Sequence, residues 1–537
     1  MNSKLPHLKK GVFLLLAPFV FSCGGLKFTA SELKIPPHFE GKKAALNDSQ
    51  KKHWHLLDLA KDSIPGMSVE RAYKELIKDN KGEKVIVAII DSGVDIDHRE
   101  LNESIWVNSG EIPNNGIDDD NNGYIDDIHG WNFLGKITKE NMEVVRLQKK
   151  EKPESDAFKK LEEARKESLL KKERELVEIN YMVDKAKVTD SILSIALNKK
   201  NYSLEEAEEI SPKTFSIMEA IIFRRFLTER NLTLSKLKKY AEGTKTGIKA
   251  HYNIDFDGRS LLGDNPEDID DRGYGDPKVM GPDKKDADHG THVAGIIAAK
   301  RDDNSGSKGI AKNIEIMVLR AVPDGDEYDK DVALAIRYAV DNGARIINTS
   351  FGKGQSPHVE WVWDALKHAE KKDALVINAA GNSGKNIDPG YDKSFITDEK
   401  EGVEIVSNFI TVGASSSSYG EDQIASFSNY GRKNVDVFAP GNAIWSSVPN
   451  DRFDYYDGTS MAAPNVSGVA AVLRSYFPKI SASQIKQILI KSGLPIYSQI
   501  LDPEEGGLIS PNKISRSGKV VNLYNALIFA SNKLYKK

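Results

Sequence analysis

The sequence VIVAIIDSG at residues 85–93 decides which fold this chain is expected to adopt. Its continuous apolar run, Val85–Ile90, lacks the polar alternation of a half-exposed strand, so it predicts a strand that is buried on both faces, as in a parallel sheet. Asp91 follows directly. Because reactive side chains and ligands gather at the carboxyl ends of the strands in open parallel sheets, Asp91 is a candidate functional residue.

Comparable apolar runs recur along the chain and alternate with segments of helical spacing. Strands are expected at residues 314–319, 345–348, 374–378, 409–412 and 435–438, and helices at 332–340, 362–369, 461–476 and 483–492. Strands that alternate with helices are typical of a parallel sheet wrapped by its crossover helices. The sequence therefore predicts the α/β class, with a parallel β-sheet flanked by helices.

A highly charged block, residues 137–249, interrupts this alternation. Leu169, Leu176 and Val183 follow one another at intervals of seven, and Ser203 with Glu206 has the spacing of a capping box. The block is therefore predicted to be a helical insertion. Two roles stay open for it: a solvated helical outgrowth without a part in the chemistry, or a hairpin that covers the cleft as a lid or binds a partner.

Three further motifs place polar residues at the ends of predicted elements. They are DHGTHVAG at 288–295, NAAGN at 378–382 and GTSMAAP at 458–464. The last one opens an apolar helix, whose dipole would polarise a hydroxyl at its N-terminus. Proline 464 is expected in the first turn, where a missing N–H is tolerated.

Hydrolysis by a serine needs a base for the hydroxyl proton, an acid that orients the base, and donors for the developing oxyanion. His289 is the candidate base, Asp91 its acidic partner, Ser460 the nucleophile and Asn382 the donor. Taken singly, Ser460 is equally well explained as a helix cap and Asn382 as a turn residue. His292 lies close to His289, but no HExxH pattern accompanies the pair, so we expect it to face the core rather than a metal.

Taken jointly, the four motifs in the order Asp, His, Asn, Ser resemble the subtilisin-like serine proteases, or subtilases. The resemblance covers roughly residues 51–530 apart from the insertion. It implies that Asp91 orients His289, that His289 serves as general base and then as general acid, and that Ser460 forms an acyl-enzyme. It also implies that Asn382 and the backbone N–H of Ser460 stabilise the oxyanion.

The same resemblance implies where a substrate lies. Ser350, Phe351 and Gly352 would form an edge that pairs with extended substrate backbone, and Ala380 and Gly381 would flank the pocket for the side chain before the scissile bond. One departure from the family pattern is an asparagine at position 465, where subtilases often have histidine. Since that position lies outside the triad, altered packing is expected rather than lost activity.

An acidic loop, NGIDDDNNGYIDD at 115–127, has oxygen ligands at the alternating spacing that a hard cation needs. Calcium is the expected ion, and the predicted ligands are the side chains of Asp118, Asp120, Asn122 and Asp126 and the carbonyl of Tyr124. Position twelve of the loop lacks the usual glutamate, a role that Asp127 is able to fill. The alternative is an acidic turn without an ion. A second acidic stretch, 264–271, is expected to be a solvated loop.

The amino-terminal segment predicts export. Residues 1–22 have the basic and apolar regions of a signal peptide, and the sequence VFSC at 20–23 resembles a bacterial lipobox. Lipidation of Cys23 would leave residues 23–50 as a tether and anchor the chain to the bacterial cell envelope, with the outer membrane as the expected site. The alternative is an ordinary secretory signal and a secreted protein.

Composition limits the remaining possibilities. With 75 basic and 79 acidic residues the formal net charge is −4, which argues against a nucleic-acid partner. A single cysteine excludes an intramolecular disulfide. We therefore expect a monomeric serine endopeptidase that acts on protein or peptide substrates. The alternative is a catalytically silent scaffold or binding module with the same fold.

Overall fold

The computed structural model describes residues 27–36, 39–42, 44–211, 213–230, 232–301, 306–388, 398–400 and 402–535. The predicted signal peptide, 1–22, and Cys23 lie outside these residues. Among the helices described, none combines the length and the apolar composition that crossing a bilayer would require.

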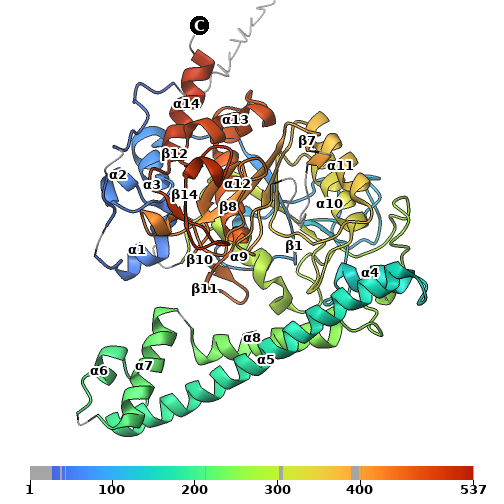
Figure 1. The fold of residues 1–537 in the computed structure, drawn as a ribbon. Helices are drawn as coiled ribbons and strands as arrows, with labels where there is room; N and C mark the ends of the chain where they lie inside the picture. Colours follow the sequence, from blue (N-terminus) through green and yellow to red (C-terminus); the bar gives the residue numbers. More distant parts are fainter. Residues whose placement is uncertain are drawn as a thin grey trace, which may run out of the picture.

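A nine-stranded sheet forms the centre of the protein (Figure 1). Its order is β12-β15-β9-β8-β5-β4-β1-β3-β2, and every pairing is parallel except that of β12 with β15. This confirms the predicted fold class. The strands are β1 (Val85–Asp91), β2 (Gly130–Asn132), β3 (Ile314–Arg320), β4 (Ile346–Thr349), β5 (Leu375–Ala379), β8 (Phe409–Ser415), β9 (Val437–Pro440), β12 (Leu494–Pro495) and β15 (Lys519–Val520).

Helices cover both faces of the sheet because successive side chains of a strand point to opposite sides. Val87 and Ile89 of β1 belong to a core shared with α9 (Asp288–Ala298), α12 (Thr459–Tyr476), α13 (Ala482–Ser492) and α14 (Leu523–Tyr535). Ala88 and Ile90 belong to a second core, shared with α10 (Asp329–Asp341) and α11 (Val359–Lys371). Strand β1 is thus buried on both faces, as its apolar run predicts.

Short elements complete the body. They are α1 (Asp48–His53), α2 (Leu59–Asp62), α3 (Val69–Ala72), β6 (Glu399–Lys400), β7 (Val403–Glu404), β10 (Ile444–Val448), β11 (Arg452–Tyr456), β13 (Ile500–Leu501) and β14 (Leu508–Ile509). Part of the predicted tether lies against α14: the Phe28 N–H donates to Ser531 Oγ at 3.0 Å and the Leu33 N–H to Asn525 Oδ1 at 2.6 Å.

The charged block folds into helices that project from the body and run along one side of it (Figure 1). The helices are α4 (Glu143–Lys150), α5 (Asp156–Leu197), α6 (Leu204–Glu208), α7 (Phe215–Glu229) and α8 (Leu234–Thr246). We call α5 to α8 the arm. Ile179, Val183, Phe223 and Leu237 are buried in a core of the arm's own. The capping box at Ser203 forms as its spacing predicts.

Buried charges hold the base of the arm against the body. Arg146 of α4 donates to the carbonyl oxygens of Asp326 and Glu327, at 2.7 and 3.0 Å. Arg259, which follows the arm, pairs with Asp264 at 2.6 Å and with Asp331 at 2.5 Å, and both of these carboxylates are fully buried. The expectation of a solvated loop is therefore wrong for Asp264, because a buried arginine recruits its carboxylate.

Candidate active site

The carboxyl end of β1 and the first turn of α9 bring Asp91 and His289 together. His289 Nδ1 lies 2.8 Å from Asp91 Oδ1, which also accepts the Ser92 N–H at 2.7 Å. Glycine at position 290 permits this approach, since a Cβ there would lie 2.1 Å from the Gly93 carbonyl oxygen. The carboxylate is 2% exposed whereas the imidazole side chain is 38% exposed, so only the histidine can reach a ligand.

The pKa of His289 is raised above its ordinary value of 6.5. Burial alone would lower this pKa, because it disfavours the charged imidazolium. The nearby negative charge of Asp91 and its hydrogen bond outweigh burial, and Asp288 adds a smaller effect in the same direction. The site therefore stabilises the imidazolium that forms when this histidine accepts a proton.

Ser460 is the only residue of α12 that is not buried. Its hydroxyl donates to the Ser350 carbonyl oxygen at 2.9 Å, and the Ser350 hydroxyl donates to the Ser460 carbonyl oxygen at 2.9 Å. The sequence predicts Pro464 in the first turn, but α12 begins at Thr459, so Pro464 is its sixth residue and lies in the second turn. Because proline lacks an N–H, the Ser460 carbonyl has no helical donor, and the Ser350 hydroxyl takes that place.

The amide of Asn382 is held by Thr459, the residue before Ser460. Its Oδ1 accepts the backbone N–H of Thr459 at 2.8 Å and the Thr459 hydroxyl at 2.9 Å. With Oδ1 occupied, Nδ2 is the group that remains to donate to a ligand beside the N-terminus of α12. Gly458, with φ of +154°, provides the sharp backbone turn into this helix.

The backbone beyond β4 has the features of an open edge. Among the described residues, no hydrogen bond satisfies the backbone of Phe351 or Gly352, although Ser350 is tied to Ser460. By contrast, the backbone of Ala380 and Gly381 is bonded. Asn429 donates to both of their carbonyl oxygens, and the Gly381 N–H donates to the Thr459 hydroxyl. An unpaired edge beside a rigid loop can accept an extended chain as an added strand.

Two cavities open on either side of His289. The first has a volume of about 430 Å³ and is lined by Asp91, Ser350 and Phe351 among others. The second has a volume of about 350 Å³, and Asn382 and Ser460 line it together with residues of α8. The four residues predicted from the separate motifs thus share one site.

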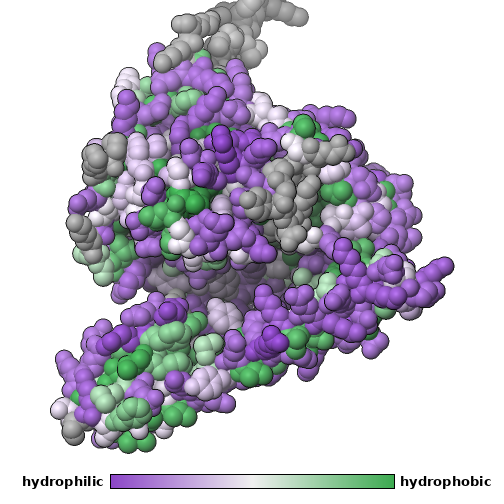
Figure 2. Space-filling model, viewed as in Figure 1, coloured by the Kyte–Doolittle hydropathy of each residue, from purple (hydrophilic) through white to green (hydrophobic). Residues whose placement is uncertain are grey.

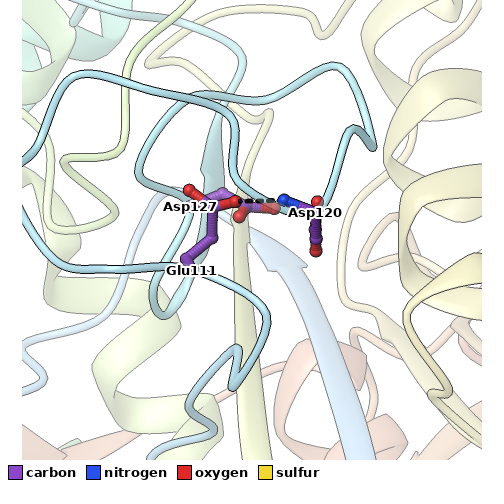
Figure 3. Close-up of side chains that lie close together, drawn as sticks. All are labelled: Glu111, Asp120 and Asp127. Atoms are coloured by element: carbon purple, nitrogen blue, oxygen red, sulfur yellow. Dashed lines mark hydrogen bonds between the residues drawn. The ribbon is translucent and has the colours of Figure 1, made fainter.

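The predicted calcium loop gathers a different set of carboxylates. Oxygens of Glu111, Asp120 and Asp127 lie within 4.8 Å of one another (Figure 3), and the dashed line marks the Asp120 N–H that donates to Glu111. Asp118 instead accepts the N–H groups of Asn122 and Gly123, at 3.1 and 2.9 Å.

Asp126 likewise accepts backbone N–H groups of the loop, from Asn115 and Gly116. The ring of Tyr124 packs edge-on against Trp131 and Tyr338. These residues therefore shape the loop, whereas three carboxylates converge on one point. Oxygen-only donors of this kind fit a hard cation such as Ca²⁺.

Two polar residues near the site have structural partners. His292 is buried, stacks on Tyr456 with ring centroids 4.3 Å apart, and lies 3.1 Å from the Ile444 carbonyl oxygen. Burial lowers its pKa to about 3, so it stays neutral and faces the core as expected. Asn465, at the position where subtilases often have histidine, donates to the Pro440 carbonyl oxygen at 2.9 Å.

Sequence reasoning missed Glu111 and the supporting roles of Ser350 and Thr459. Glu111 precedes the loop motif, so a ligand pattern based on loop positions does not reach it. Thr459 stands directly before the candidate nucleophile, but only the folded chain shows that its hydroxyl holds Asn382.

The model of the Subtilase family, peptidase S8, matches residues 82–513 of this chain. That match covers most of the sequence and contains all four motif residues. The chain therefore belongs to the subtilase family.

Similar curated proteins are proteases. The thermophilic serine proteinase of Bacillus sp. (strain AK1) is 40% identical over 231 residues, 43% of this chain and 50% of that protein. The cell wall-associated protease of Bacillus subtilis (strain 168) is 35% identical over 49% of this chain and 26% of its own length. The major intracellular serine protease of the same organism is 36% identical over 39% of this chain and 63% of its own length.

The matches thus span less than two thirds of each of these relatives. Among solved structures, the prenylagaramide maturation protease PagA is 28% identical, with 45% of this chain and 82% of that chain covered and a TM-score of 0.36.

The raised pKa of His289 predicts the pH dependence of catalysis. A general base must be neutral, so kcat/KM should rise with pH through this pKa, with its acid limb above pH 6.5. Asp91→Asn removes the carboxylate that raises the pKa of His289, so burial should lower this pKa and move the acid limb to lower pH. In the same variant kcat should fall roughly 10⁴-fold.

A pH profile on a small peptide ester measures both effects. Asp97→Asn, an exposed neighbour in the loop after β1, is the matched control and should leave the acid limb in place. An acid limb that stays unchanged in Asp91→Asn would contradict the coupling of the two residues.

Proposed function

We propose that this chain is a serine endopeptidase that hydrolyses peptide bonds through an acyl-enzyme on Ser460. The observation that carries the proposal is the joint placement of the four motif residues. A buried carboxylate is bonded to a partly exposed imidazole, and both a hydroxyl at a helix N-terminus and an anchored amide line one cavity with that imidazole. Membership of the subtilase family supports the same reading.

The proposed mechanism assigns a proton path to these atoms. Ser460 Oγ turns from the Ser350 carbonyl towards His289 Nε2, gives up its proton to that nitrogen, and attacks the scissile carbonyl carbon. Asp91 stabilises the imidazolium and keeps Nδ1 protonated. His289 then donates the proton to the departing amine, which leaves the acyl group on Ser460. In the second half of the reaction, water gives a proton to His289 and attacks the acyl carbon. His289 returns the proton to Ser460 Oγ as the carboxylic acid is released.

Charge develops on the carbonyl oxygen in the tetrahedral intermediate. Asn382 Nδ2 and the backbone N–H of Ser460 are the proposed donors, and a donor of this kind is worth about 3 to 4 kcal/mol of barrier. The donors lie at the start of α12, whose dipole adds to the stabilisation. Thr459 keeps the amide in place, so little reorganisation is needed at the moment of attack.

The proposed substrates are proteins or peptides in extended conformation, and the chain is proposed to act as a monomer. The unpaired backbone of Phe351 and Gly352 supports pairing with a substrate strand. The alternative is a catalytically silent scaffold. The Asp91–His289 bond and the Asn382 amide held by Thr459 argue against it.

Replacing the nucleophile tests the proposal. Ser460→Ala should reduce kcat on casein or a peptide by about 10⁶-fold, a loss known from a subtilisin, while the melting temperature stays close to that of the unmodified chain. Ser418→Ala, in an exposed loop, is the control and should keep full activity. Equal turnover by Ser460→Ala and the unmodified chain would overturn the assignment.

We also propose a structural calcium ion at the acidic loop. Of the ligands predicted from the sequence (Asp118, Asp120, Asn122, Asp126 and the Tyr124 carbonyl), the proposal keeps Asp120, because Asp118 and Asp126 accept backbone N–H groups of the loop. The convergence of Asp120 with Glu111 and Asp127 supports a cation and adds two carboxylates to the candidates. Without a cation these charges repel one another. The ion would join the loop to Tyr338 of α10, whose hydroxyl donates to Asp127.

Calcium removal should lower the melting temperature, because an ion that binds only the folded state stabilises it by about 2.7 kcal/mol at a hundred times Kd. Glu111→Gln should shrink the difference in melting temperature between calcium and chelator. Asp270→Asn, an exposed aspartate outside the loop, should retain the full difference. Identical melts of the unmodified chain with and without chelator would count against the site.

Finally, we propose that the chain is exported and anchored to the cell envelope through lipid on Cys23. The lipobox-like sequence and the lack of any second cysteine support this proposal. The full chain made in a bacterium should incorporate a palmitate analogue and sediment with membranes. Cys23→Ser should lose the label and become soluble; label that persists in Cys23→Ser would refute lipidation at this residue.

A further inference from the structure

The second cavity of the active site is closed on one side by the arm. Besides Ser460 and His289, its lining includes Lys236, Lys239 and Tyr240 of α8. Figure 2 shows the arm facing the body across a furrow. The insertion therefore does not merely flank the domain: five of its residues, three of them on α8, line a cavity together with the reacting groups.

Helix α8 packs into the core of the arm with one face and lines the cavity with another. Leu237 and Ala241 are buried in the core of the arm against α5, while Lys236, Lys239 and Tyr240 have the i, i+3, i+4 spacing of an adjacent helix face. The Tyr240 side chain is about half exposed (52%), and it lines the cavity rather than packing into the arm.

Lys239 and Lys236 connect this face of α8 to α9 and to β11. Lys239 Nζ lies 2.5 Å from Asp288 Oδ2, next to the catalytic histidine, and 3.1 Å from the Tyr456 hydroxyl. Tyr456 also donates to Asp288 and stacks on His292.

Lys236 adds a weaker contact with Asp454 of β11, at 3.8 Å. The gap between α8 and the catalytic residues is therefore part of the folded structure, because charged contacts on both α9 and β11 define it.

The positions of the two cavities assign them to opposite sides of a scissile bond. Ser350 and Phe351, at the edge proposed for the acyl side of the substrate, line the first cavity and are absent from the lining of the second. The second cavity is lined by Ser460, His289 and Asn382, and no residue of the edge lines it. A chain that pairs with the edge and continues past Ser460 must enter the space beneath α8.

We propose that α8 forms the wall of the substrate cleft on the leaving-group side, and that Tyr240 and Lys236 bind the residues that follow the scissile bond. This inference rests on the proposed function. It makes the arm a specificity element: a space of about 350 Å³ with α8 as one wall admits an extended segment but not the surface of a folded protein. Lys239 is a positioning residue that keeps the wall next to α9.

Two substrates with the same acyl side test the proposal. One is a peptide p-nitroanilide, which has no residues after the scissile bond. The other is a quenched fluorescent peptide that extends four residues beyond it. Tyr240→Ala and Lys236→Ala should each lower kcat/KM for the extended peptide by roughly five- to tenfold, mainly through KM, as loss of a binding contact does.

For the nitroanilide the same variants should stay within about twofold of the unmodified chain, since the leaving group ends before α8. Tyr240→Phe, which keeps the ring, should restore most of the activity on the extended peptide. Lys245→Ala, on the same helix but paired with Glu242, is the control and should change neither substrate.

Equal losses on both substrates, or no loss on the extended peptide, would overturn the assignment of α8 to the leaving-group side. If the unmodified chain cleaves neither substrate, the proposed function itself fails and this inference falls with it. The two failures are distinguishable because the nitroanilide reports on Ser460 without involving the arm.

Discussion

The hydrogen bond between Asp91 and His289 is the interaction on which the active site depends. It joins the carboxyl end of the central strand β1 to the first turn of α9, and the glycine at position 290 allows the two backbones to approach, because a Cβ there would collide with the Gly93 carbonyl oxygen. The buried Asp91 carboxylate is held in place and shielded from water. It therefore fixes the orientation of the His289 imidazole and favours its protonated form. Helix α12 is anchored in the same core and leaves one residue, Ser460, outside it. Rigid burial on every side thus brings the reactive groups to a single opening.

The arm is attached by two kinds of electrostatic contact with different strengths. At its base, Arg146 and Arg259 are buried and bonded to the body, so removal of a charged partner would leave an uncompensated charge at a cost of several kcal/mol. Near the active site the contacts of Lys236 and Lys239 are partly exposed, and such pairs are worth about 0 to 1 kcal/mol each. A firm base with weakly held contacts at the cleft suits an element that must adjust to a substrate without leaving its place.

The sequence was sufficient to predict the parallel sheet and the four motifs that line the candidate active site. Strand β1 could be predicted because an uninterrupted apolar run has few alternatives. Asp91 ends strand β1 and Asn382 follows β5, and the carboxyl ends of these parallel strands lie at the same edge of the sheet. Contacts between distant segments could not be predicted. Glu111 joins the acidic loop from outside its pattern, Asp264 is buried because Arg259 recruits it, and the Ser350 hydroxyl replaces a helical bond that Pro464 removes. The helical spacing of the charged block predicted its helices. It did not predict the contact of Lys239 with Asp288 beside the cavity, because no local pattern relates these two residues.

In the proposed mechanism the Asp91–His289 pair activates the hydroxyl of Ser460. The most direct measurement is mass spectrometry of the purified chain after reaction with a fluorophosphonate, followed by peptide mapping, beside the variant His289→Ala. The unmodified chain should carry one adduct, located on Ser460, and the variant almost none. An adduct on a different residue, or equal labelling of both proteins, would contradict this mechanism.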